Sequence, residues 1–184
     1  MIASDLELIA ACKLGNRASQ EALYKRFAAK MLGVCLRYSK DRSEAEDILQ
    51  EGFIKVFLNM EKYRGEGSLE GWVRRIMVNT ALEKFRSNRK LYPVIDVELA
   101  VLSPTEGENI FAKFAAMDIL KMIQGLPAGY RTVFNLYAIE GYSHEEISGL
   151  MGISEGTSKS QLSRARLALK ELIKQSEMNQ SYLD

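Results

Sequence analysis

Residues 141–166 constrain this chain most, because their capping residues and one glycine define two helices and the turn between them. Ser143 can cap the first helix, and Glu146, three residues later, completes a capping box. Gly152 stands where that helix must end, since glycine adopts the left-handed C-cap conformation at little cost. Ser154 can then cap a second helix. The pattern predicts a helix-turn-helix.

The second helix, expected to end near Lys174, has an apolar and a basic face. Its apolar residues follow three- and four-residue spacing and should face inward: Leu162, Ala165, Leu169 and Ile173. Near the N-terminal end of the opposite face lie Lys159, Ser160, Ser163 and Arg164. This is where a recognition helix meets base edges in the major groove, and Arg, Lys and Ser can all pair with bases there.

Charge alone does not decide what this helix does. Residues 157–174 carry five cations and one acid, a net charge of +4, and a solvated basic face on an ordinary helix pair would look the same. The caps, the turn glycine and the basic face together favour DNA binding. We expect Ile147 and Leu150 to be the buried positions of the first helix, and Ile153 to fill the turn.

The whole-chain composition limits the classes of function. The 184 residues leave room for one domain or two small ones, and 47% apolar residues suffice for buried cores. A net charge of +1 argues against a globally basic nucleic-acid binder, so DNA contacts must come from local patches. Cys12 and Cys35 form no CxxC pair, which fits buried thiols in a reducing cytosol. We expect neither a signal peptide nor a membrane span, and hence a cytoplasmic protein.

The sequence carries no enzyme signature. No metal-ligand spacing, phosphate-binding loop or nucleophile motif is present, and we expect no cofactor and no metal. His144 is the only histidine. It falls in the first turn of the helix-turn-helix, where a surface or capping role is favoured over catalysis.

Helical spacing recurs along most of the chain, so we expect an all-α fold of two small helical domains. An opening helix begins at a capping box of Ser4 and Glu7 and stops at Gly15. Between residues 91 and 108, prolines, a glycine and scattered acids break the period. We therefore predict a domain of residues 1–90, a flexible linker of residues 91–108, a domain of residues 109–176 and a tail of residues 177–184. Further helices are expected at residues 18–38, at 43–60 after a capping box of Ser43 and Glu46, and at 68–89, 109–124 and 127–140.

The helix expected at residues 43–60 has an acidic face opposite its apolar one. That face begins with Glu44, Asp47, Gln50 and Glu51. Three carboxylates at three- and four-residue spacing repel one another mildly, and the helix dipole offsets this only in the first turn. A basic protein partner and a merely solubilising surface both explain such a face.

A glycine-flanked loop and a basic helix follow. Gly65 and Gly67 allow unusual backbone angles within residues 63–68. Residues 72–90 hold six cations and one acid, a net charge of +5. Cations that track phosphates, beside rings or pockets that hold splayed bases, are what single-stranded nucleic acid needs. A solvated basic face, with Trp72 as a core anchor and Asn79 in an internal hydrogen bond, is the plainer interpretation.

Taken in order, these segments resemble an extracytoplasmic-function sigma factor of bacterial RNA polymerase, over about residues 21–172. Residues 45–57, AEDILQEGFIKVF, resemble the helix of the second sigma region that docks on the polymerase clamp. Residues 63–82, YRGEGSLEGWVRRIMVNTAL, resemble the promoter-melting loop and helix of that region. Residues 126–134, LPAGYRTVF, and the helix-turn-helix resemble the fourth region. Ser158 and Gln161 depart from the family's commoner valine and arginine.

The resemblance implies a role for each surface. Core RNA polymerase would meet Asp47, Gln50 and Glu51 through its clamp, and would meet the fourth region through its flap. Promoter DNA would be opened at the −10 element by the loop and the basic helix, and its −35 element would be read by the recognition helix. The implied DNA-binding residues are Tyr63, Arg64, Trp72, Arg75, Asn79, Arg86, Arg89, Lys159, Ser160, Ser163 and Arg164. Whether an anti-sigma factor also binds the chain stays open.

The runner-up hypothesis is a stand-alone helix-turn-helix regulator with an unrelated N-terminal sensor domain. Such a regulator usually dimerises and reads two half-sites one helical turn apart. It leaves the acidic face and the basic helix of the N-terminal domain without a role.

Overall fold

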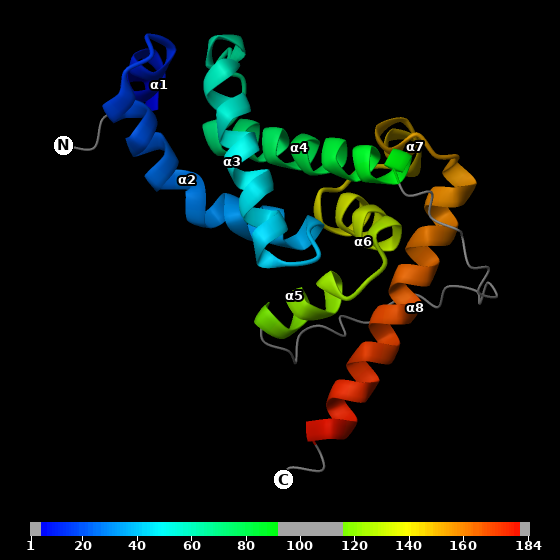
Figure 1. The fold of residues 1–184 in the computed structure, drawn as a ribbon. Helices are drawn as coiled ribbons and strands as arrows, with labels where there is room; N and C mark the ends of the chain where they lie inside the picture. Colours follow the sequence, from blue (N-terminus) through cyan, green and yellow to red (C-terminus); the bar gives the residue numbers. More distant parts are fainter. Residues whose placement is uncertain (1–4, 92–115, 181–184) are drawn as a thin grey trace. The chain divides into compact units, whose positions relative to one another are not determined.

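The computed structural model describes residues 5–91 and 116–180, without the side chains at residues 5, 89–91 and 177–180. Every regular element in those two segments is helical (Figure 1). The chain divides into two compact units, Met1–Lys84 and Phe85–Asp184. The all-α prediction is therefore confirmed. The predicted cap at Ser4, most of the predicted linker and residues 109–115 of the helix expected at 109–124 lie outside the described residues.

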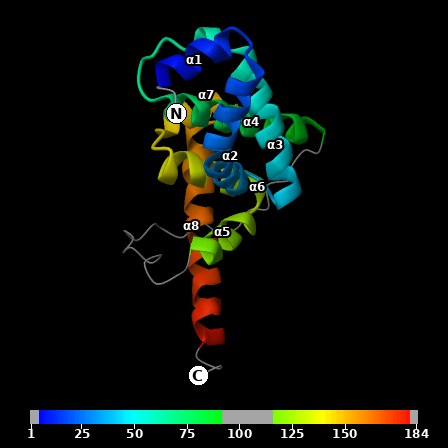
Figure 2. The same ribbon diagram turned by 90° about the vertical axis from the view of Figure 1, so that its left-hand side faces the viewer.

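The first unit is built on a pair of long helices, α2 (Arg17–Tyr38) and α3 (Arg42–Leu58), which lie side by side (Figure 2). The short helix α1 (Asp5–Lys13) packs on α2, and the 3-10 turn η1 (Met60–Lys62) follows α3. Helix α4 (Leu69–Leu91) begins in this unit and continues past its boundary. The fully buried side chains of the unit include Leu23, Met31, Ile48, Val56, Val73, Met77 and Leu82.

A glycine sets the packing between α3 and α4. A Cβ built on Gly52 would overlap the sulfur of the fully buried Met77. Glycine at this position therefore lets the Met77 side chain lie directly against the backbone of α3. The interior is close-packed, so even one added methyl group here displaces a core side chain.

The start of α3 differs from the prediction. Asp41 is the N-cap, and its Oδ1 accepts a hydrogen bond of 2.8 Å from the backbone amide of Glu44. The Glu44 carboxylate accepts 2.8 Å from the amide of Lys40, so it satisfies a second free donor. The capping box predicted at Ser43 and Glu46 is wrong, because Asp41 already provides the acceptor and places Ser43 inside the helix. Glu46 pairs with Arg42 instead.

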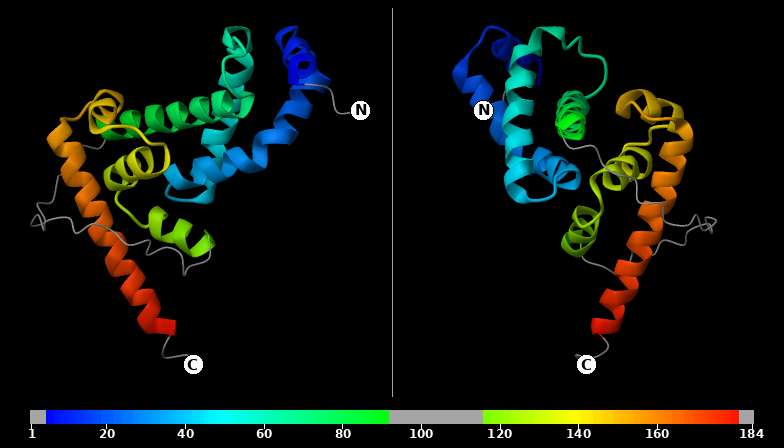
Figure 3. Two further views of the ribbon diagram at one scale, coloured as in Figure 1. Left: turned by 180° about the vertical axis from the view of Figure 1, so that it is seen from behind. Right: turned by 45° about the vertical axis from the view of Figure 1, so that its right-hand side comes forward.

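The second unit contains α5 (Ala116–Gln124), α6 (Ala128–Phe134), the π-helical turn η3 (Asn135–Ile139), α7 (His144–Met151) and α8 (Glu155–Gln180). The helix predicted at residues 127–140 is thus α6 followed by a wider turn, in which the Glu140 amide donates to Asn135 O over 3.0 Å. Helix α8 runs past the predicted end at Lys174 and is drawn in Figure 3 as one long helix. Val133, Leu136, Ile147, Leu162 and Leu169 are buried between these helices.

Candidate nucleic-acid interface

The helix-turn-helix forms as the capping residues predict. Ser143 Oγ accepts from the Glu146 amide at 3.2 Å, and the Glu146 carboxylate accepts from the Ser143 amide at 2.8 Å. Gly152 ends α7 in the left-handed conformation, with φ 65° and ψ 41°. Ser154 Oγ accepts from the Thr157 amide at 3.0 Å and so caps α8. Local hydrogen bonds therefore fix both ends of the turn.

The inward face of α8 is also as predicted. Leu162, Ala165, Leu169 and Ile173 are all buried. On α7, Ile147 is fully buried, but Leu150 is only half-buried and Met151 takes the second core position. The prediction that Leu150 is the second core residue was wrong by one position. Helical spacing allows the residue at either i+3 or i+4 from Ile147 to be buried, and the packing selects Met151 at i+4.

The predicted recognition residues share one segment of α8 but differ in exposure. Lys159 is exposed and forms a 3.3 Å ion pair with Glu155, a kind of surface contact that stabilises little. Ser160 Oγ donates to Thr157 O within its own helix. Ser163 and Arg164 are half-buried. Arg164 Nε is buried and has no hydrogen-bond partner among the described residues. A ligand that accepted a hydrogen bond from this atom would offset the cost of burying it unpaired.

A polar and aromatic cluster that the sequence did not predict joins α7 to α8. His144 Nδ1 lies 2.8 Å from Ser158 Oγ, and its ring stacks on Tyr137 with centroids 4.6 Å apart. The Arg166 guanidinium lies 5.8 Å from the Tyr137 ring centre. Burial lowers the pKa of His144, and the positive charges of Lys159 and Arg166 add to this effect against Glu155. His144 is therefore an internal link of the helix-turn-helix.

Two residues of α8, Ser158 and Gln161, differ from the residues that are common in the family. Both of them face inward. Ser158 is fully buried and supplies the hydroxyl that meets His144. Gln161 is 9% exposed, and its amide would lie 3.2 Å from a Cβ built on Gly129 of α6. Both residues belong to the packing of α8 against its neighbours. The sequence held one signal of this cluster. Its only histidine and a serine that is unusual for the family both fall in the helix-turn-helix.

In the first unit, the predicted acidic face of α3 lies in solvent. Asp47, Gln50 and Glu51 are all exposed. Lys84 of α4 approaches Asp47 at 3.2 Å, and Lys55 meets Glu51 at 2.7 Å. These lysines partly neutralise the face.

One of these lysines also bridges two helices. Lys55 contacts Glu83 of α4 at 2.6 Å in addition to Glu51. Partial burial acts to lower the pKa of Lys55, but the hydrogen bonds and charges of Glu51 and Glu83 outweigh it and raise that pKa. The acidic face of α3 is thus tied by ion pairs to the helix that carries the predicted DNA contacts.

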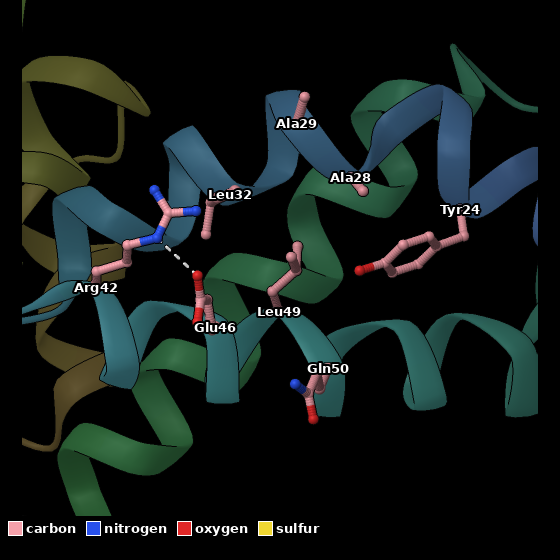
Figure 4. A pocket seen from close by; sticks show the side chains of 8 residues that line it. All are labelled: Tyr24, Ala28, Ala29, Leu32, Arg42, Glu46, Leu49 and Gln50. Carbon is pink, nitrogen blue, oxygen red and sulfur yellow. Dashed lines mark hydrogen bonds and ion pairs between the residues drawn. The ribbon is translucent and has the colours of Figure 1, made fainter.

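A recess lies beside this face, between α2 and α3 (Figure 4). Helix α3 contributes Leu49, Gln50 and the Arg42–Glu46 ion pair of 2.7 Å, and α2 contributes apolar side chains with the hydroxyl-bearing ring of Tyr24. Gln50 therefore stands at the edge of a partly apolar depression. Its predicted polymerase contact need not be purely polar.

Helix α4 presents the predicted melting residues along one face. Arg75, Asn79 and Arg86 are exposed, and helical spacing places them on one side, with Trp72 half-buried at the start. The solvent exposure of Asn79 argues against the internal hydrogen bond considered for it. Arg89 falls in α4, but its side chain is outside the described part of the molecule.

The loop before α4 separates its two predicted base-contacting residues. Arg64 is exposed, whereas Tyr63 is only 6% exposed. Tyr63 Oη donates to Gly67 O over 2.9 Å, and its ring centre lies 5.3 Å from that of Trp72. The structure therefore brings Arg64, Arg75, Asn79 and Arg86 to the surface and holds Tyr63 inside.

Within residues 5–91 and 116–180, His, Cys, Asp and Glu form no group of three that could hold a metal ion. No helix of that part is long and apolar enough to cross a bilayer. Cys12 and Cys35 are free and buried, and burial raises the pKa of Cys35 to about 12.

Comparisons with known proteins match two separate segments of the chain. Residues 23–91 match the family model described as Sigma-70 region 2, and residues 116–169 match Sigma-70, region 4. An RNA polymerase sigma-H factor from Pseudomonas aeruginosa is 28% identical over 176 residues, which cover 90% of this chain and 91% of that protein. An ECF RNA polymerase sigma-E factor from Escherichia coli is 27% identical over 177 residues, 90% of this chain and 92% of the relative.

A solved structure supports the fold. The sigma factor RpoE from Bartonella quintana, in a co-crystal with the anti-sigma factor NepR, aligns with a TM-score of 0.51 and 22% identity. The alignment covers 84% of this chain and 96% of that one. At this identity the likeness concerns the fold alone.

Proposed function

This chain belongs to the extracytoplasmic-function sigma factors of the sigma-70 family, and from that membership we propose which of its surfaces carry each step of transcription initiation. As a sigma factor it binds core RNA polymerase and directs initiation at specific promoters. It acts in the cytoplasm as an initiation factor without catalysis of its own, and the polymerase performs the chemistry.

The acidic face of α3 is the docking site for the clamp of core polymerase. Its support is the exposure of Asp47, Gln50 and Glu51 on one helix that also lies within the matched region 2. A basic partner would exchange the intramolecular contacts of Lys84 and Lys55 for its own cations. Because the carboxylates of Asp47 and Glu51 are exposed, their ion pairs with these lysines are weak and the exchange costs little.

The loop and the exposed face of α4 contact the −10 element. Arg64 from the loop, Arg75 and Asn79 contact the opened strand, and Arg86 and Arg89 neutralise phosphates. Trp72 supports strand opening from the start of the helix. The supporting observation is that Arg64, Arg75, Asn79 and Arg86 lie in solvent, three of them on one helical face.

The recognition helix α8 contacts the −35 element. Lys159, Ser160, Ser163 and Arg164 lie in its first turns after a correctly capped turn, where the recognition helix of this motif meets base edges. The same unit contacts the polymerase flap. The Bartonella quintana relative was solved with an anti-sigma factor, and a partner of that class is proposed for this chain.

A single observation carries the proposal: the exposed acidic helix and the basic helix lie in the segment that matches region 2, and the helix-turn-helix lies in the segment that matches region 4. A stand-alone dimeric regulator would leave the match of residues 23–91 unexplained.

Run-off transcription with sigma-free bacterial core polymerase on a library of promoter fragments tests the function. Discrete start sites that depend on this protein are the expected result. Specific duplex binding by the protein alone, with neither transcription nor a complex with core, would instead support the dimeric regulator.

A further inference from the structure

The loop between η1 and α4 is held at both ends. At its far end, Ser68 Oγ accepts from the Gly71 amide at 3.0 Å and so starts α4. Between the ends, Gly65 has φ 81° and Gly67 has φ 78°, a backbone region that side-chain-bearing residues rarely adopt. The loop therefore has a defined shape in the free protein.

Tyr63 shapes the loop from within. Its hydroxyl crosses the loop to Gly67 O, 2.9 Å away, and its ring packs against Trp72 at an interplanar angle of 52°. At 6% exposure the ring is not available for a base to stack on. The loop's solvent-facing side chains are those of Arg64, Glu66 and Ser68.

A contact from the N-terminal helix holds the near end. Lys13, in the last turn of α1, donates from Nζ to Tyr63 O over 3.1 Å. This contact joins residues fifty positions apart, and α1 lies beside η1. Helix α1 is outside residues 23–91, so the matched region 2 does not account for it.

We propose that Lys13 and Tyr63 are positioning residues for the promoter-melting loop. Lys13 fixes the main chain where the loop begins, and Tyr63 spans the loop, so that Arg64 and the backbone near Gly65 meet the −10 strand in one geometry. Tyr63 thus acts through the loop and does not contact the base itself. The inference rests on the proposed −10 contact and assigns α1 a role in it.

The first test needs no polymerase, because Trp72 is the only tryptophan and its ring contacts Tyr63. Lys13→Met should increase acrylamide quenching of Trp72 fluorescence. In Lys13→Arg the quenching should return most of the way to the wild-type level. Lys62→Met removes an equally charged, exposed side chain from η1 and is the control. Equal quenching in wild type, Lys13→Met and Lys62→Met would overturn the positioning role of Lys13.

The second test uses the holoenzyme and single-stranded non-template oligonucleotides that carry either the cognate −10 sequence or one changed base. Lys13→Met and Tyr63→Phe should each reduce the affinity ratio between the two by about three- to tenfold, the effect of one lost hydrogen bond. Lys62→Met should leave the ratio unchanged. An equal loss of affinity for both oligonucleotides would overturn the proposal, because it would indicate an electrostatic role.

The two tests separate this inference from the proposed function. If wild-type protein forms no holoenzyme, the function fails, and the Trp72 measurement still decides whether Lys13 holds the loop. If holoenzyme forms and only the selectivity prediction fails, the function stands and the positioning role is rejected.

Discussion

The two units organise their candidate surfaces in different ways. In the second unit the recognition helix is set by contacts close in sequence, such as the capping box of Ser143 and Glu146 and the left-handed Gly152. In the first unit the surfaces depend on distant contacts, such as Lys84 with Asp47 and Lys13 with Tyr63. A local motif can therefore be recognised from sequence, whereas a surface built by tertiary contacts needs the structure.

The largest expected effect comes from reversing a charge on the acidic face. Asp47→Arg should weaken binding to core polymerase by several kcal/mol, because a like charge would then face a basic partner. Co-purification with core measures the loss. Glu21→Arg, which reverses an exposed acid of α2 that pairs with Lys25, should bind core normally. Normal co-purification of the Asp47 variant would remove Asp47 from the interface.

The next largest effect is expected from the packing of α3 against α4 in the first unit. Gly52→Val should lower the free energy of unfolding by about 2–3 kcal/mol, since overpacking a filled core is costly and Met77 occupies the space. A Cβ at Gly33 of α2 would meet nothing within 4 Å, so Gly33→Val should change stability little. Chemical denaturation compares the two. Similar stabilities would show that Met77 moves aside without cost.

Arg164 tests the recognition surface of the second unit. Arg164→Ala should weaken binding to the cognate upstream promoter box by ~1–3 kcal/mol, the size of a bidentate base contact. Competition binding against scrambled DNA measures it. An equal loss on both DNAs would make Arg164 a phosphate contact.

The smallest effect concerns His144. Its pKa lies below the ordinary value of 6.5 because burial and nearby cations disfavour the protonated ring. The unfolded chain therefore takes up the proton first as the pH falls. The contribution of the neutral ring to the free energy of unfolding is fully present above pH 6.5. It is lost as the pH falls through the pKa of His144 in the folded protein.

His144→Gln isolates this effect. Thermal unfolding of the second unit should be less sensitive to a change from pH 7.5 to pH 5.5 in the variant than in the wild type. The same pH sensitivity in both proteins would show that other groups cause it.

Much of the fold could be predicted from sequence, for physical reasons. Helical spacing identified the core face of α8, since burial requires that period. The end of α7 followed from glycine, whose left-handed conformation is nearly free of cost. The start of α3 was misplaced, because Ser43 and Asp41 are both good caps and only the main-chain path selects Asp41.

The candidate site was less accessible to sequence reasoning. Exposure of Asp47, Arg75 and Asn79 agrees with their predicted roles, which stay predictions until binding is measured. The burial of Tyr63 could not be anticipated, because an aromatic residue beside glycines suits either a base contact or an internal support. The partner of His144 was equally hidden, since Ser158 lies fourteen residues away on the next helix.

The central claim is that the two units read two promoter elements separately. Transcription by holoenzymes that carry Asn79→Ala, Arg164→Ala or both, on promoters altered in the −10 or the −35 element, tests it most directly. The account predicts that Asn79→Ala loses discrimination only at the −10 element, that Arg164→Ala loses it only at the −35 element, and that the losses add in the double variant. Loss at both elements from either single variant would contradict it.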